Sequence, residues 1–235
     1  MSAAQPGNSN ICSISSRIGQ VVGALAWQPS LFGGGDDPPD IDGDFSGCRR
    51  RLLAEGAWVD VVPGWLRGAD VLFDRLLEHT PWRGREVRMY ERVLPEPRLT
   101  HRWVLPEQCP GELADPLLAR MAEVLSERYG ERFTQVGVNL YRDGADSVAW
   151  HGDRVARELP SAIVALVSLG AVRPFRLRPT GGGRSVGLAP GPGDLLVLGG
   201  SCQRTWQHSV PKVRSAGPRI SIQFRHAYPD IVPGA

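Results

Sequence analysis

The pattern of apolar and polar positions divides the chain near residue 130. Before this point, two segments carry apolar residues at helical spacing, at residues 70–79 and 113–129. Each has the apolar stripe of an amphipathic helix, and Gly130 supplies a stop signal for the second. The pattern therefore predicts two helices that each bury one face.

After Gly130, short segments rich in β-branched and apolar residues alternate with Gly/Pro turns such as TGGG at 180–183. One more such segment, 57–62, precedes the helices. The later predicted strands are 134–141, 147–153, 161–169, 173–178, 194–198, 206–210 and 219–226. Many short strands at this spacing predict a sandwich or barrel, with the two helices covering one face of the larger sheet. The predicted fold class is α+β, mainly β.

The length of 235 residues fits one full domain with a sizeable core. Residues 1–45 are rich in Ser, Gly, Pro and Asp, which predicts a mobile N-terminal tail ahead of a domain at 46–235. The formal charge of +2 neither indicates nor excludes nucleic-acid binding. Lys212 is the one lysine among 27 basic residues, and the arginines suit carboxylate or phosphate partners.

The cysteine pattern and the hydropathy of the chain indicate the cellular compartment of the protein. Cys12, Cys48, Cys109 and Cys202 form no CxxC pair, so neither a disulfide framework nor a structural zinc site is expected. No apolar run approaches the length of a membrane span. We expect a soluble protein of a reducing compartment, the cytoplasm.

The stretch NLYRDGADSVAWHGD ends in His151 and Asp153, two positions apart. On a strand such residues point to the same side and can bind one metal ion. His208, near the end of a later strand, would complete a 2-His-1-carboxylate triad that leaves open positions on Fe(II). The alternative is an ordinary polar loop, because HxD pairs are common.

The segment RISIQFR at 219–225 alternates strictly, with Arg219 and Arg225 on the polar side. One interpretation is that this side faces solvent. The other is that the two guanidinium groups bind the two ends of a small dicarboxylic acid inside the fold. Asn139 and Tyr141 likewise share one side of VGVNLY, either as polar ligand contacts or as ordinary buried groups.

Taken together, six ordered motifs resemble the AlkB family of Fe(II)- and 2-oxoglutarate-dependent dioxygenases, over roughly residues 57–228. The motifs are NLYRDG (139–144), WHGD (150–153), VSLGAVRPFRLR (167–178), PGDLLVLGG (192–200), QRTWQHSVPK (203–212) and RISIQFR (219–225). The resemblance implies a double-stranded β-helix, or jelly roll, with its core at about 134–228. It also implies oxidative demethylation of N-alkylated bases in DNA or RNA, using 2-oxoglutarate and dioxygen and releasing succinate and formaldehyde.

The resemblance also implies roles for individual residues. The implied Fe(II) ligands are His151, Asp153 and His208. The implied 2-oxoglutarate contacts are Asn139, Tyr141, Arg219, Ser221 and Arg225, with Arg219 at the distal carboxylate. Residues 89–105 resemble a nucleotide-recognition lid, placed at about 86–105. The candidate substrate contacts are Tyr90, Arg98, Arg102, Trp103, Trp150 and Val155.

Within the lid, Trp103 and Tyr90 are candidates for stacking on a flipped base, with Arg98 and Arg102 near phosphates. The alternative for Trp103 is that it anchors the lid to the core. Val155 departs from the family pattern, because many members carry an acidic residue there that contacts a base amino group.

Ser221 and Gln223 also depart from the family, since they replace the usual Asn and Thr, but both keep polarity. The expected partner is alkylated DNA or RNA with a flipped base, bound by a monomer without a membrane. Two alternatives stay open at this point. One is a 2-oxoglutarate-dependent hydroxylase of a protein or small molecule, and the other is a catalytically silent nucleic-acid-binding jelly roll.

Overall fold

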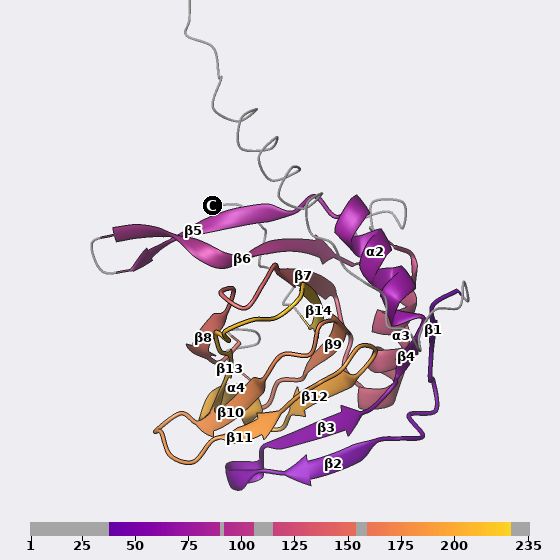
Figure 1. The fold of residues 1–235 in the computed structure, drawn as a ribbon. Helices are drawn as coiled ribbons and strands as arrows, with labels where there is room; N and C mark the ends of the chain where they lie inside the picture. The colour runs from indigo at the N-terminus through magenta and orange to yellow at the C-terminus, as the bar shows by residue number, and fades with distance from the viewer. Residues whose placement is uncertain (1–37, 90–91, 106–114, 154–158, 227–235) are drawn as a thin grey trace, which may run out of the picture.

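The structure is a computed structural model that describes residues 38–89, 92–105, 115–153 and 159–226. Two antiparallel β-sheets face each other, and two helices lie on the outer side of the larger sheet (Figure 1). The larger sheet has the strand order β2 (Arg49–Leu52), β3 (Trp58–Val62), β12 (Leu195–Gly199), β9 (Val164–Gly170), β14 (Arg219–Arg225), β7 (Gln135–Tyr141), β6 (Arg92–Val104), β5 (Arg83–Met89). This is the predicted jelly roll.

The smaller sheet has four strands and faces the middle of the larger one (Figure 1). Its order is β11 (Val186–Leu188), β10 (Phe175–Pro179), β13 (Trp206–Val210), β8 (Val148–His151). A two-stranded sheet pairs β1 (Asp40–Ile41) with β4 (Leu66–Arg67). The helical segments are η1 (Ala54–Gly56), α2 (Ala69–His79), α3 (Leu117–Tyr129) and α4 (Cys202–Thr205).

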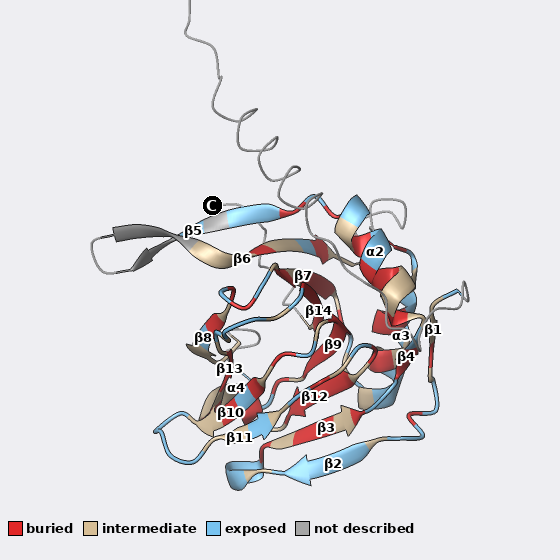
Figure 2. Ribbon diagram, viewed as in Figure 1, coloured by how far each residue is buried: buried red, intermediate tan, exposed pale blue. Residues whose placement is uncertain are grey.

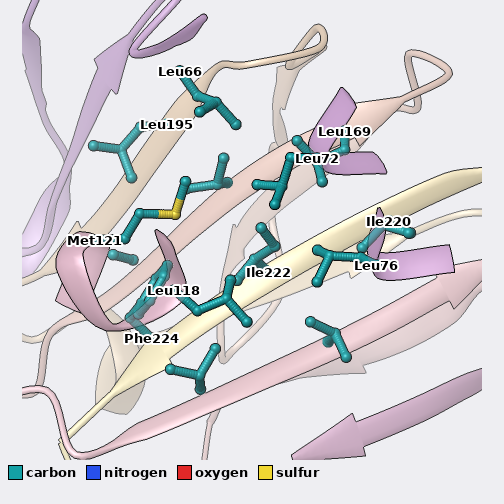
Figure 3. Close-up of a cluster of buried hydrophobic side chains, with 14 of the residues drawn as sticks. Leu66, Leu72, Leu76, Leu118, Met121, Leu169, Leu195, Ile220, Ile222 and Phe224 are labelled. Carbon is teal, nitrogen blue, oxygen red and sulfur yellow. The ribbon is translucent and has the colours of Figure 1, made fainter. Parts of the chain in front are cut away.

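The main hydrophobic core lies between the larger sheet and helices α2 and α3 (Figure 3). Leu72 and Leu76 of α2 and Leu118 and Met121 of α3 are fully buried, which confirms the predicted apolar stripes. They pack against alternate residues of β7, β9, β12 and β14. Figure 2 shows the ribbons of β9 and β12 in the colour of buried residues. Gly130 ends α3 with a φ of 68°, a left-handed conformation that glycine adopts without strain.

A second core cluster lies between the two sheets. Val164 and Leu166 of β9 contact it from the larger sheet, and Phe175 and Leu177 of β10 contact it from the smaller one. Because both faces of the central strands are covered, β9 and β12 are buried at every position. Their near-continuous apolar sequences follow from this double burial.

Most predicted strands occur within three residues of their expected bounds, and β13 covers the predicted 206–210. The predicted N-terminal boundary differs, because Ile41 and Phe45 are buried in the main core and β1 pairs with β4. The folded domain therefore begins before residue 46; residues 1–37 lie outside the described residues. Of the described helices, none is long and apolar enough to cross a membrane.

Candidate metal and cosubstrate site

Two neighbouring strands of the smaller sheet bring His151 and His208 together. His151, at the end of β8, is the register partner of His208 on β13, and their ring centroids lie 4.2 Å apart. Asp153 follows two residues after His151, and its backbone N–H donates to Gln203 Oε1 at 3.0 Å. One ligand atom from each of the three residues lies within 4.8 Å of the others. The structure thus brings together all three predicted metal ligands.

The protonation states of these groups suit a cation. Burial lowers the pKa of His208 to about 3, so its imidazole is neutral at ordinary pH. Burial alone would raise the pKa of Asp153, but Arg225 and the two histidines lower it to about 2. The Nδ1 of His151 lies 2.8 Å from the carbonyl oxygen of Ala149, which only accepts. Nδ1 therefore carries the hydrogen, and Nε2 of His151 keeps a lone pair that can bind a metal.

Two neutral imidazoles and one carboxylate form the ligand set of non-haem Fe(II) oxygenases. The carboxylate is oriented by two charged hydrogen bonds, since Arg225 Nε and Nη2 each donate to an Asp153 oxygen at 3.2 Å. The residues present therefore fit Fe(II) with positions left for further ligands.

The polar side of β14 faces inward. Arg219, Ser221 and Gln223 are buried, and they pair in register with Tyr141, Asn139 and Gly137 of β7. The interpretation of this side as a solvent-exposed face is therefore wrong. The smaller sheet covers it, so these side chains line a cavity instead of a surface.

Arg219 has the character of an anion-binding residue. Its side chain is 2% exposed, and its Nη2 donates to Ser168 Oγ at 2.9 Å. Its Nε and Nη1 atoms are buried without a hydrogen-bond partner among the described residues. Burial lowers the pKa of Arg219. A buried guanidinium with two unused donors favours a carboxylate ligand.

The three candidate metal ligands and the inward polar side chains of β7 and β14 line one cavity of about 810 Å³. This volume lies within the usual range for ligand sites, roughly 300–1,000 Å³. The predicted site residues that line it are Asn139, Tyr141, His151, Asp153, His208, Arg219, Ser221, Arg225, Arg98 and Arg102.

Hairpin β5–β6 corresponds to the predicted lid, and it lies at the edge of the larger sheet, paired with β7 (Figure 1). Trp103 of this hairpin is 2% exposed and belongs to the main core. This placement contradicts the predicted base stacking, because β6 turns Trp103 away from the cavity. The alternative, that Trp103 anchors the lid, fits the burial.

The remaining substrate candidates lie apart from the cavity or beyond the described residues. Trp150 of β8 is half-buried and does not line the cavity; the guanidinium carbon of Arg178 lies 4.3 Å from its ring centroid. Tyr90 and Val155 lie outside the described residues.

The cavity wall also includes residues without a predicted role. The alternation in RISIQFR could have placed Gln223 there. Glu96 lies where the register of β6 shifts, so no regular alternation places it. Phe175, whose ring centroid lies 5.5 Å from that of His208, carries no comparable signal. An apolar residue in a strand predicts that the side chain is buried, but it does not predict which residue the side chain contacts.

Comparison with known proteins identifies the class. The family model for the 2OG-Fe(II) oxygenase superfamily matches residues 61–225. Alpha-ketoglutarate-dependent dioxygenase alkB homolog 3 of Bos taurus is 34% identical over 192 residues, covering 73% of this chain and 67% of that protein. The Homo sapiens protein of the same name is 32% identical, with the same coverage of both chains.

A third relative is matched over nearly its whole length. DNA oxidative demethylase ALKBH2 of Mus musculus is 33% identical over 231 residues, covering 85% of this chain and 94% of that protein. The chain therefore belongs to the AlkB family of Fe(II)- and 2-oxoglutarate-dependent dioxygenases, within the 2OG-Fe(II) oxygenase superfamily.

Proposed function

We propose that this protein removes alkyl groups oxidatively from N-alkylated bases in DNA or RNA. The reaction is coupled to decarboxylation of 2-oxoglutarate to succinate, and a methyl group leaves as formaldehyde. The observation that carries the proposal is the convergence of His151, Asp153 and His208 in one cavity with the buried Arg219. The relative ALKBH2 of Mus musculus is named a DNA oxidative demethylase, which supports the choice of substrate.

In this proposal His151, Asp153 and His208 would hold Fe(II). With 2-oxoglutarate and dioxygen, the bound metal supplies the oxidising chemistry. The protein keeps His208 neutral by burial and Asp153 ionised through Arg225. Both groups are thus in their ligating forms before the metal arrives, so binding releases no proton from them.

Arg219 and its neighbours would bind 2-oxoglutarate. The two unpartnered donors of Arg219 match the distal carboxylate of 2-oxoglutarate. Tyr141 on β7 and Ser221 on β14 lie beside Arg219. Arg225 contacts Asp153 and therefore lies next to the metal-ligand cluster, as expected for the oxo-acid end. Asn139 adds a hydrogen-bonding amide on the same face.

The substrate would enter beneath hairpin β5–β6. Arg83 and Arg102 of this hairpin line the cavity and present positive charge to a phosphate backbone, whereas Arg98 is paired with Glu96. A base paired in a duplex cannot place its N-alkyl group inside a closed cavity, so a flipped or unpaired base is required. We propose that a monomer binds it, in the cytoplasm.

The first experiment tests the metal and cosubstrate site without any substrate. Anaerobic titration with Fe(II) and 2-oxoglutarate should produce their visible charge-transfer band. Absence of the band in folded protein would reject the site itself, and with it the dioxygenase proposal.

The second experiment tests the substrate. Oligonucleotides carrying 1-methyladenine or 3-methylcytosine should yield formaldehyde and the restored base, and should stimulate succinate formation. Stimulation by a peptide or metabolite instead would indicate a hydroxylase of another substrate. Oligonucleotide binding without any iron-dependent succinate would indicate a silent nucleic-acid-binding protein.

A further inference from the structure

Strand β6 presents alternate side chains to the cavity, because successive residues of a strand point to opposite faces. Thr100 pairs in register with Asn139 of β7, and both residues line the cavity. Arg98 and Glu96 also lie on the cavity wall, in the part of β6 where the pairing with β5 shifts register between Gly84 and Glu86.

Hydrogen bonding fixes this part of β6 beside a strand of the metal site. The backbone N–H of Ser147 donates to the carbonyl oxygen of Pro97 at 2.9 Å. Ser147 immediately precedes β8, the strand that ends at His151. Glu96 and Arg98, on either side of Pro97, are therefore held next to the strand that carries a metal ligand.

Glu96 and Arg98 form an ion pair that leaves one polar atom of each side chain unused. Arg98 Nη2 donates to Glu96 Oε1 at 2.6 Å, and the side chains are 18% and 17% exposed, respectively. Glu96 Oε2 and Arg98 Nε are buried and have no hydrogen-bond partner among the residues that the structure describes. Buried polar atoms of charged groups are unfavourable without partners, so a ligand with a donor and an acceptor fits here.

Glu96 differs from the other acidic group of the cavity. Among the described residues that line the cavity, the carboxylates are those of Glu96 and Asp153. Both oxygens of Asp153 accept from Arg225, and Asp153 belongs to the metal-ligand cluster. Glu96 is therefore the carboxylate that has an oxygen left for a substrate.

We propose that Glu96 is a specificity-determining residue, whose Oε2 accepts a hydrogen bond from the exocyclic amino group of the alkylated base. This inference rests on the proposed function. Cytosine and adenine carry such an amino group, whereas uracil has a carbonyl oxygen in its place. An ionised carboxylate only accepts hydrogen bonds, so it stabilises the first kind of base and repels the second.

The ion pair matches a cytosine alkylated at N3 in charge and in hydrogen bonding. Alkylation leaves this base positively charged, which strengthens its hydrogen bond to a carboxylate. Arg98 Nε offers a donor that a base carbonyl oxygen can use. The pair thus presents one acceptor and one donor to a base edge.

The test compares 3-methylcytosine with 3-methyluracil, which differ at C4, in otherwise identical single-stranded oligonucleotides. With Fe(II) and 2-oxoglutarate, wild-type protein should show a kcat/KM higher by about tenfold or more for 3-methylcytosine. Glu96→Gln should reduce this ratio by about tenfold, because an amide can donate to the uracil carbonyl. Glu96→Asp, which keeps the charge but withdraws the oxygen, should also reduce the ratio.

Glu86→Gln is the matched control, since Glu86 is an exposed residue of β5 outside the cavity wall. It should leave the ratio unchanged. Uncoupled 2-oxoglutarate turnover and thermal melting of each variant report whether the protein is folded and loaded.

The outcomes separate this inference from the proposed function. If wild-type protein repairs 3-methylcytosine but neither Glu96 variant changes the ratio, the role of Glu96 is overturned and the function stands. An equal change in Glu86→Gln would overturn it too. If wild-type protein repairs 1-methyladenine but neither 3-methylcytosine nor 3-methyluracil, the role of Glu96 is overturned and the function stands. If it repairs none of the three while turning over 2-oxoglutarate, both fail.

Discussion

Strand β14 has two faces with opposite chemistry in one run of seven residues. Ile220, Ile222 and Phe224 are fully buried in the core beneath helices α2 and α3. On the other face, Arg219 and Ser221 are almost equally buried, but they line the cavity. Both faces are therefore largely buried, with Arg225 half-buried at the end of the polar face, and the main difference is the layer that covers each face.

This comparison separates stability from activity along one strand. The apolar face has protein atoms on all sides, so it contributes free energy of folding. The polar face keeps buried donors without partners, which is unfavourable for the ligand-free protein and favourable for binding an anion. Substitutions on the two faces should therefore affect different measurements.

The largest effect is expected on the cavity side. His208→Ala removes one of three metal-binding groups, so turnover should fall to background while the fold is retained. The 2-oxoglutarate-dependent formation of succinate measures the first, and circular dichroism with thermal melting measures the second. Retained turnover would remove His208 from the metal site.

The next largest effect is expected in the core. Trp103→Ala should lower the free energy of unfolding by about 3–5 kcal/mol, the usual range for a large buried aromatic side chain. Chemical denaturation measures this change. If the variant instead keeps its stability and loses only nucleic-acid turnover, Trp103 contacts the substrate and its assignment to the core is wrong.

A smaller effect is expected for Arg219→Met. The KM for 2-oxoglutarate should rise by about 10- to 100-fold, since charged hydrogen bonds to the carboxylate are lost. The unfolding free energy of the ligand-free protein should be unchanged or higher, because a buried guanidinium with unused donors is removed. A loss of stability with an unchanged KM would contradict the assignment.

The smallest effects come from two adjacent residues of β14. Ile222→Val should lower the unfolding free energy by about 0.5–1.5 kcal/mol and leave the KM for 2-oxoglutarate unchanged. Ser221→Ala should raise that KM by a few-fold and leave stability nearly unchanged. The two variants need the same pair of measurements, and a reversed result would show that the faces are misassigned.

Several parts of the fold could be predicted from the sequence because they repeat at a fixed period. The stripes in α2 and α3 and the alternation in β14 identify elements and the residues that share a face. Strands β1 and β4, with two residues each, and β11, with three, are too short to show a period. They depend on partners far along the chain.

Part of the candidate site could also be predicted from the sequence. His151 and Asp153 are two positions apart in the chain, so their proximity follows from local geometry, although β8 ends at His151 and Asp153 lies just beyond the strand. That His208 lies directly opposite His151 depends on the pairing of β8 with β13, which are more than fifty residues apart. His208 is a candidate because it lies near the end of a later strand and because the family resemblance implies it as a ligand. No local signal gives the strand pairing itself.

The sequence alone determined which residues lie together on each face of the elements long enough to show a period, such as α2, α3 and β14, since side-chain direction follows from backbone period. It did not determine what covers each face. The tertiary structure decided that Trp103 lies in the core and that the polar face of β14 is enclosed. The physical reason is that burial depends on a second layer, and that layer is built from segments distant in the chain.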